Sequence, residues 1–453
     1  MAQGQQPKHS IEQVAAQSPD MREELLDQLQ AIAPEAFTEG KLDLDKLTQL
    51  TAGAVEDKPE RFAFTWAGKR DAVAILQAPT RATLVPDPEN SINFDEAQHV
   101  FIEGENLETL KVLYRAYFGR VKMVYIDPPY NTGNDLIYPD NFADPLDHYL
   151  RVTGQKCGNG DYLSSSPETS GRYHSAWLSM MYPRLVLARQ LLRDDGVIFI
   201  TIDDHEMANL RLLMNEIFGE ENFVASIIWK KMDSPSRNDK DRYVTNYHDY
   251  ILCYARSRER AGLKQKTKPE ILKAYPLQLS DGRYRTIADI AHGRIQKSIE
   301  RLQQQKEQPD PDEREGPENL SLCAFKLAGS SMRRWSGGVK TKDADAYAAQ
   351  LDAFADTLVD GWKSENVIWE VALREGFALT SEIEKQEIEG QTFWRVTDPE
   401  REQSFHICLD DALSIEAVRA LGLTRENLFV CRDKALDDTL AANLALQCRL
   451  KVL

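Results

Sequence analysis

The sequence of 453 residues lacks the features that would place it in a membrane or in an oxidising compartment. No apolar run approaches the roughly 18–20 residues that a bilayer span needs, and the polar first twenty residues lack the apolar segment of a secretory signal. The six cysteines include no Cys-x-x-Cys and no Cys/His pair with metal-ligand spacing. We therefore expect a cytoplasmic protein with reduced, mostly buried thiols, no membrane contact and no metal site.

The sequence also has no excess of positive charge. Its 55 Lys and Arg residues face 72 Asp and Glu residues, which gives a formal net charge of −17. This balance argues against a protein whose whole surface binds nucleic acid. It leaves room for a local basic groove, because binding depends on where the cations lie rather than on their sum. With 42% hydrophobic residues, a chain of this length predicts two to four globular domains.

A strand, a helix and a strand follow one another from His99. Residues 99–104 (HVFIEG) predict a short strand, and Asn106 can cap a helix over 106–118 that Gly119 ends. Residues 121–126 (VKMVYI) predict a strand buried on both faces. We expect this βαβ unit to belong to one sheet.

The alternation continues downstream. Residues 174–193 predict a helix in which Pro183 causes a kink or marks the true start. Asp194-Asp195-Gly196 predicts a turn before further elements: a strand at 197–202, a helix at 204–218, and strands at 223–229 and 250–254. This order is typical of an α/β fold with a doubly wound, mostly parallel sheet, Rossmann-like in its core.

Changes of composition divide the chain into four segments. Residues 1–90 predict an N-terminal helical region and a Pro/Asp-rich connector, and residues 91–256 form the α/β core. Residues 257–320 contain a basic stretch and a charged, Pro-rich linker. Residues 321–453 mix helices with short strands and predict a smaller C-terminal α/β module.

The segment with the clearest chemistry is Asp127-Pro128-Pro129-Tyr130-Asn131-Thr132-Gly133, directly after the strand at 121–126. Open α/β sheets bind ligands at the carboxyl ends of their strands. Two prolines cannot continue a central strand, so they predict a rigid corner whose carbonyls point outward. Such a corner suits a flat heterocycle with an exocyclic amine: Asp127 and the Pro128 carbonyl accept the two amine hydrogens, and Tyr130 stacks on the ring. A strand-ending turn is the alternative, which the full motif disfavours.

The stretch VYIDPPYNTGN resembles the catalytic motif of β-type DNA methyltransferases that act on the exocyclic amine of adenine. The flanking sequence resembles the modification (Mod) subunits of type III restriction–modification systems, in stretches such as RFAFTWAGKRDA, VFIEGENLETLKVL, LRDDGVIFITIDDHE and ENVIWEVALREGFALTSEIEK. The resemblance covers nearly the whole chain. It implies that residues 91–256 are a methyltransferase core.

The resemblance also implies a reaction. S-adenosylmethionine donates a methyl group to N6 of an adenine that has rotated out of duplex DNA. The catalytic residues, which hold the base, would be Asp127, Pro128, Pro129 and Tyr130. The residues that contact the cofactor would be Glu105, Asp127, Asn131 and Thr132. For Glu105, a solvated glutamate at a helix start is an equally good interpretation. The implied partners are double-stranded DNA, a second copy of the chain in a homodimer, and a restriction (helicase–nuclease) subunit.

One departure from the family pattern concerns the cofactor loop. Relatives carry a glycine-rich loop and a long target-recognition segment where this chain has only about 30 residues between Tyr254 and Thr286, and F-x-G-x-G occurs nowhere. Either the sequence omits an internal segment, with the join near Tyr284-Arg285, or the chain is a deletion that is inactive alone. The match on both sides favours excision.

The departure leaves other functions open. A catalytically impaired Mod-like subunit that binds DNA or supports assembly is the alternative function. A methyltransferase for free nucleotides, RNA or protein glutamine shares the amine-gripping logic but fits the flanking sequence poorly.

Basic residues after the core predict the DNA contacts. The basic stretch 256–273 and the residues upstream of it can follow a phosphate backbone, although a solvated linker is equally plausible. The candidates are Lys230, Lys231, Arg256, Arg258 and Lys264. Asp203-Asp204-His205 is better explained by capping of the next helix than by a metal site.

Overall fold

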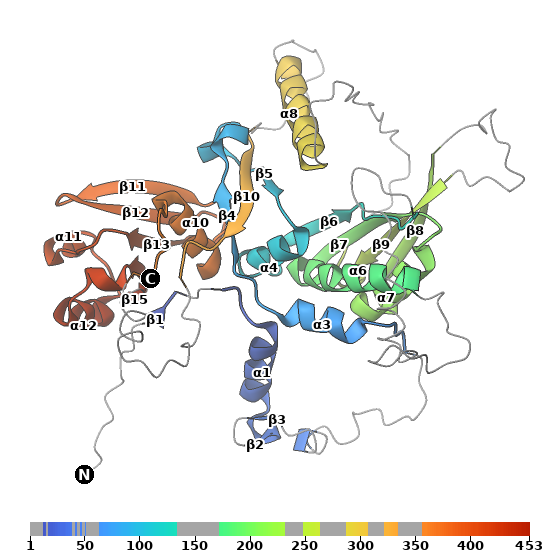
Figure 1. The fold of residues 1–453 in the computed structure, drawn as a ribbon, viewed down its shortest axis with the longest axis horizontal. Helices are drawn as coiled ribbons and strands as arrows, with labels where there is room; N and C mark the ends of the chain where they lie inside the picture. Colours follow the sequence, from blue (N-terminus) through green and yellow to red (C-terminus); the bar gives the residue numbers. More distant parts are fainter. Residues whose placement is uncertain are drawn as a thin grey trace, which may run out of the picture. The chain divides into compact units, whose positions relative to one another are not determined.

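The computed structural model describes residues 12–14, 17–38, 41–42, 46–47, 50, 63–133, 172–231, 248–262, 287–306, 321–333 and 356–453. They fall into two compact units whose segments interleave in the sequence. Unit 1 comprises Met1–Ser18, Thr80–Ala116 and Ala291–Leu453, and unit 2 comprises Pro19–Pro79 and Tyr117–Ile290. Each unit is described by itself (Figure 1). None of the helices in the described ranges combines the length and apolarity of a membrane span.

Unit 2 is built on a four-stranded sheet with the order β6-β7-β9-β8. The strands are β6 (Val121–Ile126), β7 (Leu192–Ile202), β9 (His248–Ala255) and β8 (Phe223–Lys230). Helices α6 (Arg172–Leu191) and α7 (Met207–Phe218) pack on this sheet. Their contact forms a core around Trp177, Leu185, Ile198, Leu213 and Tyr254, all of which are fully buried.

This sheet corrects the expected topology of the core. Among the described strands, β6 and β7 are parallel, whereas the pairs β7/β9 and β9/β8 are antiparallel, so the sheet is mixed rather than mostly parallel. The expected βαβ unit does not lie in one sheet, because β5 pairs with β10 in unit 1. The prediction that the strand at 121–126 is buried on both faces is wrong, since Met123 and Tyr125 are each 57% exposed.

Two local predictions around β7 differ from the structure for steric reasons. The expected turn at Asp194-Asp195-Gly196 is part of β7, where the pairing with β6 shifts register between Val121 and Met123. A Cβ at Gly196 would lie 2.8 Å from the carbonyl oxygen of Arg193 and 3.1 Å from that of Val121, so this irregularity requires glycine. Pro183 lies inside α6 and does not mark its start.

Helix α3 (Lys69–Gln77) packs beside α6 in unit 2. The indole Nε1–H of Trp66 donates to the hydroxyl of Ser179 at 2.9 Å, which ties the chain before α3 to α6. The remaining elements of unit 2 are α1 (Met21–Ile32), β2 (Phe37–Thr38) and β3 (Lys41–Leu42). The short 3-10 helices of the described chain are η1 (Pro34–Ala36), η2 (Pro88–Asn90), η3 (Phe94–Glu96), η4 (Glu220–Asn222) and η5 (Asp433–Ala435).

Unit 1 contains a three-stranded sheet in which β10 (Cys323–Gly329) lies between β4 (Ala82–Pro86) and β5 (Val100–Glu103). β4 lies in the segment 78–98 that the sequence predicts to be an extended connector, and it pairs antiparallel with β10. Helix α4 (Asn106–Tyr117) follows β5, and α10 (Ser364–Glu375) packs on β4. Helix α8 (Ile287–Lys306) extends from the end of unit 2 into unit 1.

The second sheet of unit 1 has six strands in the order β1-β15-β14-β13-β12-β11. They are β1 (Glu12–Gln13), β15 (Arg449–Val452), β14 (Leu428–Cys431), β13 (Gln403–Cys408), β12 (Gln391–Asp398) and β11 (Glu382–Ile388). Helices α11 (Ile415–Ala420) and α12 (Asp438–Gln447) complete this α/β module. The expectation of buried thiols is confirmed for the five described cysteines, which are all free and buried.

Candidate active site

The Asp127–Thr132 corner lies where β6 ends, beside the end of its parallel neighbour β7. Because the two strands are parallel, their carboxyl ends meet at one edge of the sheet. Asp127 is exposed at this edge, Pro128 is buried beneath it and Tyr130 is half-buried. The sequence motif therefore presents its carboxylate to solvent at the position where α/β sheets bind ligands.

Two hydroxyl groups orient the carboxylate of Asp127. The Thr201 hydroxyl, near the end of β7, donates to Asp127 Oδ1 at 2.6 Å, and the Tyr130 hydroxyl donates to the same oxygen at 3.2 Å. Within the described part of the chain no hydrogen bond reaches Asp127 Oδ2. One carboxylate oxygen is thus fixed by the protein, while the other is available to a ligand.

The Tyr130 side chain joins the corner to the core of unit 2. Its ring packs against the buried cluster formed by α6, α7 and the sheet. Burial, with the nearby carboxylates of Asp127 and Asp249, raises the pKa of the Tyr130 hydroxyl far above its usual value. The phenol therefore stays protonated at neutral pH and acts as a hydrogen-bond donor to Asp127.

A hydrogen bond from the core of unit 2 fixes the second proline of the motif, Pro129. The fully buried Trp177 donates its indole N–H to the carbonyl oxygen of Pro129 at 2.8 Å. The expectation that the carbonyls of both prolines point outward is therefore wrong for Pro129. Among the described residues, none donates a hydrogen bond to the carbonyl of Pro128, which remains an acceptor.

A buried carboxylate that the sequence reasoning missed holds the next residue of the motif. Glu206, the residue before α7, is 0% exposed. Its Oε1 accepts from Asn131 Nδ2 at 2.6 Å and lies 2.8 Å from His174 Nδ1, while its Oε2 accepts from Asn209 Nδ2 at 2.8 Å. Asn131 adopts a left-handed backbone (φ 62°), which asparagine tolerates better than most residues. The network fixes the corner against the first turns of α6 and α7.

The acidic run before α7 forms a local turn. Asp203 Oδ1 accepts the backbone N–H of His205 at 2.9 Å, and Asp203 Oδ2 lies 2.8 Å from the ring Nδ1 of His205. No group of three or more His, Cys, Asp or Glu residues with metal-binding geometry occurs among the described residues. Helix α7 has Glu206 at its N-cap without a side-chain capping bond, so Asp203 orders the turn rather than capping the helix.

The predicted basic residues Lys230 and Lys231 lie at the end of β8. Both are exposed, and Lys231 Nζ lies 2.5 Å from Asp249 Oδ1 at the start of β9. Asp249 is the same carboxylate that acts on Tyr130, so these lysines are near the Asp127–Thr132 corner. Beside them on β8, Trp229 is 56% exposed.

The remaining basic candidates for DNA contacts differ in their exposure and in their hydrogen bonds. Arg256 Nη1 donates to the carbonyl oxygens of Arg189 and Leu192, each at 2.9 Å, so this guanidinium is bound to the end of α6. Arg258 is exposed. Lys264 lies outside the described residues. Of the predicted DNA contacts, Lys230, Lys231 and Arg258 are exposed and Arg256 is bound to carbonyls inside unit 2.

The residues assigned to the cofactor fall in both units of the structure. The Glu105 carboxylate accepts the backbone N–H of Glu108 at 2.8 Å, which is the bond of an N-cap, so Glu105 rather than Asn106 caps α4. Glu105 belongs to unit 1, whereas Asp127, Asn131 and Thr132 belong to unit 2. The Asn131 amide already donates to Glu206 and to the Tyr173 carbonyl.

The comparison with protein families defines the class. The model of the N6/N4 methyltransferase family, described as DNA methylase, matches residues 121–405, more than half of the chain and including the Asp127–Thr132 corner. The chain belongs to this DNA methylase family.

Individual relatives narrow the class. The chain is 38% identical over 284 residues to the Mod subunit of the type III restriction–modification enzyme StyLTI from Salmonella typhimurium, covering 58% of this chain and 43% of that subunit. It is 35% identical over 236 residues to the EcoP15I Mod subunit from Escherichia coli, covering 51% of this chain and 36% of that subunit. The resemblance to type III Mod subunits is thereby confirmed, and the chain spans less than half the length of these two relatives.

Solved structures resemble the chain only weakly. The PvuII DNA methyltransferase (cytosine-N4-specific) aligns over 37% of this chain and 52% of its own, with a TM-score of 0.23 and 11% identity. A likeness at this level carries no argument about the site.

Proposed function

We propose that the chain is the adenine-specific modification methyltransferase of a type III restriction–modification system, with S-adenosylmethionine as methyl donor. The family and the Mod relatives support DNA methylation. The observation that carries the proposal within the chain is the Asp127 carboxylate, exposed at the sheet edge with one oxygen fixed by Thr201 and Tyr130.

In this proposal the corner holds a flipped base by its exocyclic amine. Asp127 Oδ2 and the Pro128 carbonyl accept the two N–H groups, and an amine held in this way directs its nitrogen lone pair toward the methyl donor. The half-buried Tyr130 stacks on the base while its hydroxyl keeps Asp127 oriented. S-adenosylmethionine supplies the methyl group when bound.

The proposal extends to the partners. Lys230, Lys231 and Arg258 are the exposed cations of unit 2 that we propose to contact the DNA backbone, with Lys264 beside them in sequence. A restriction subunit, a homodimer, a cytoplasmic location and the four-segment organisation stay part of the proposal. The relatives support a restriction subunit as partner, because they are Mod subunits of type III restriction–modification enzymes.

Transfer of a labelled methyl group tests the proposal. Unmethylated DNA is incubated with the full chain and S-adenosylmethionine labelled in its methyl group, and label in DNA is counted. We expect incorporation that Asp127→Ala abolishes. The matched control is Asp195→Ala, which removes a partly exposed carboxylate at the opposite end of β7 and should leave incorporation unchanged. Incorporation that persists in Asp127→Ala would overturn the site assignment.

The absence of F-x-G-x-G from the sequence favours one second candidate, a Mod-like subunit that binds DNA or supports assembly without catalysis. Titration calorimetry with S-adenosylmethionine separates the two candidates. Binding by this chain supports the methyltransferase. Binding of DNA without any binding of S-adenosylmethionine supports the second candidate.

A further inference from the structure

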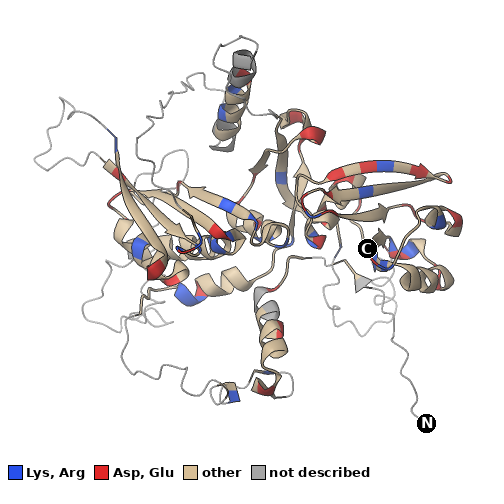
Figure 2. Ribbon diagram, turned by 180° about the vertical axis from the view of Figure 1, so that it is seen from behind, with Lys and Arg blue, Asp and Glu red and all other residues tan. Residues whose placement is uncertain are grey.

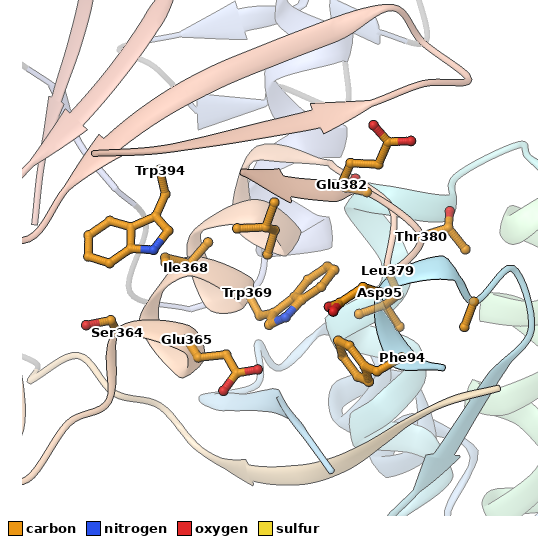
Figure 3. A pocket seen from close by; sticks show the side chains of 13 residues that line it. Phe94, Asp95, Ser364, Glu365, Ile368, Trp369, Leu379, Thr380, Glu382 and Trp394 are labelled. Atoms are coloured by element: carbon orange, nitrogen blue, oxygen red, sulfur yellow. The ribbon is translucent and has the colours of Figure 1, made fainter. Parts of the chain in front are cut away.

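Unit 1 contains a cavity of about 470 Å³ between η3, the start of α10 and the strands β11 and β12. Its walls are aromatic: in Figure 3, Trp369 lies between Trp394 and Phe94. Trp369 is 3% exposed, and its ring meets that of Phe94 edge to face at a centroid distance of 6.4 Å. Trp394 is only half-buried. A cavity of this volume with aromatic walls has the size and lining of a ligand pocket.

The charged residues that line the cavity all have one sign. They are Asp95, Glu365 and Glu382, each exposed, and no Lys, Arg or His is among the thirteen lining residues, all of which are described. Within the described part of the chain none of the three carboxylates forms an ion pair. Elsewhere on β11, which carries both acidic and basic positions (Figure 2), the one basic residue, Lys385, is paired with Glu387 at 2.7 Å. The cavity thus combines an uncompensated negative potential with low-dielectric walls.

A buried polar group in the lining also has no partner. Ser381 is 8% exposed, and its hydroxyl oxygen makes no hydrogen bond in the structure. Ser381 lies directly before Glu382, so this hydroxyl belongs to the acidic side of the cavity. Buried polar groups are nearly always hydrogen-bonded in folded proteins, so the unsatisfied Ser381 hydroxyl can accept or donate a hydrogen bond to a group that enters the cavity.

We propose that this cavity binds an arginine side chain presented by a partner protein. A guanidinium group is planar, stacks on indole faces and donates several N–H bonds in the plane that carboxylates match. The half-buried Trp394 provides the stacking surface, and Glu365, Glu382 and the Ser381 hydroxyl provide acceptors. An ammonium group fits less well, because it is more strongly hydrated and has no flat face. The proposal does not depend on the methyltransferase activity of unit 2.

Fluorine NMR of the full chain tests this proposal. The chain has seven tryptophans, so labelling with 5-fluorotryptophan gives few resonances, and Trp394→Phe identifies the one from Trp394. The probe is the peptide acetyl-Gly-Arg-Gly-amide, with the citrulline peptide as its uncharged isostere. We expect a saturable shift of the Trp394 resonance with the arginine peptide and weaker binding, by at least about fivefold, with the citrulline peptide. Equal affinity for both peptides, or no saturable shift, would overturn the proposal.

Two further comparisons make the test specific. Glu382→Gln should weaken binding on the order of two- to fivefold, the effect of a partly exposed ion pair. Glu384→Gln removes the same charge from an exposed position of the same strand outside the cavity, and should leave binding unchanged. Equal weakening by both variants would mean nonspecific attraction. Methylguanidine should bind more weakly than the peptide, and equal affinity would contradict a partner segment as the source.

Discussion

Replacement of Glu206 tests whether the buried network positions the corner or only stabilises the fold. Glu206→Ala removes the acceptor for Asn131, Asn209 and His174, although Asn131 Nδ2 keeps its bond to the Tyr173 carbonyl. His174 is 48% exposed and can turn to water, so the cost falls mainly on the two asparagines. A buried donor that loses its acceptor costs about 1–3 kcal/mol. We therefore expect Glu206→Ala to lower the free energy of unfolding by about 2–4 kcal/mol.

The conservative variant separates charge from shape. Glu206→Gln keeps one oxygen for Asn131 but turns an N–H₂ group toward Asn209, unless the Asn209 amide rotates to offer its oxygen. We expect a loss of about 1 kcal/mol for this variant. The control is Glu216→Ala, whose ion pair with Lys69 at 2.7 Å is partly exposed and worth less than about 1 kcal/mol. Urea unfolding measures all three variants.

Methyl-transfer activity shows whether Glu206 positions Asn131 or only stabilises the fold. If Glu206 positions Asn131, methyl transfer by the folded fraction of Glu206→Gln falls about tenfold or more in kcat while KM changes little. Unchanged kcat in the folded fraction would refute positioning. A loss of stability below about 0.5 kcal/mol in Glu206→Ala would refute the buried network itself.

Other predictions concern pH, the basic residues and the thiols. Burial alone would raise the pKa of Asp356, but hydrogen bonds from Arg432, the Leu358 amide and Lys434 lower it to about 2. A carboxyl group whose pKa is lower in the folded state stabilises the fold above its unfolded pKa, and this stabilisation is lost as the pH falls. In thermal unfolding, the wild type should therefore lose stability more steeply than Asp356→Asn between about pH 4 and pH 2. Arg256→Ala should destabilise the chain by about 1–3 kcal/mol in urea unfolding, because three carbonyls lose their donor. Arg258→Ala should leave urea unfolding unchanged and weaken DNA binding, which a salt titration of the DNA affinity would measure. The five described cysteines are buried, and burial raises the pKa of Cys253 and Cys323 to about 11. None of the five should therefore react quickly with a thiol reagent at pH 8 unless the chain is unfolded. Fast labelling of any of them, located by peptide mass spectrometry, would contradict the packing.

The local elements of the chain could be predicted from sequence where one signal dominates. The strand at 121–126 is found at the predicted position, although it is not buried on both faces, because a β-rich run meets two prolines that must end it. The strands near 223–229 and 250–254 and the helix after Asn106 are also found, each within a few residues. The residue pattern that predicts each of these elements lies within the element itself, so the prediction needs no knowledge of long-range contacts.

Long-range pairing could not be predicted in the same way. The pairing of β4 with β10 joins residues far apart in sequence, and nothing in the connector 78–98 indicates its partner. The role of Glu206 depends on α6, α7 and the Asp127–Thr132 corner meeting at one point, although the sequence shows only one more acidic residue beside Asp203 and Asp204. The same holds for Trp177, whose helical position predicts a core residue and not a donor to Pro129.

The most direct test of the central claim is the identity of the methylated base. DNA that has been treated with the chain and S-adenosylmethionine is digested to nucleosides, and the products are identified by mass spectrometry. A corner that holds the amine of a flipped adenine at Asp127 predicts N6-methyladenine, absent after treatment with Asp127→Ala. Methylation at N4 or C5 of cytosine, or N6-methyladenine formed equally by Asp127→Ala, would contradict the account.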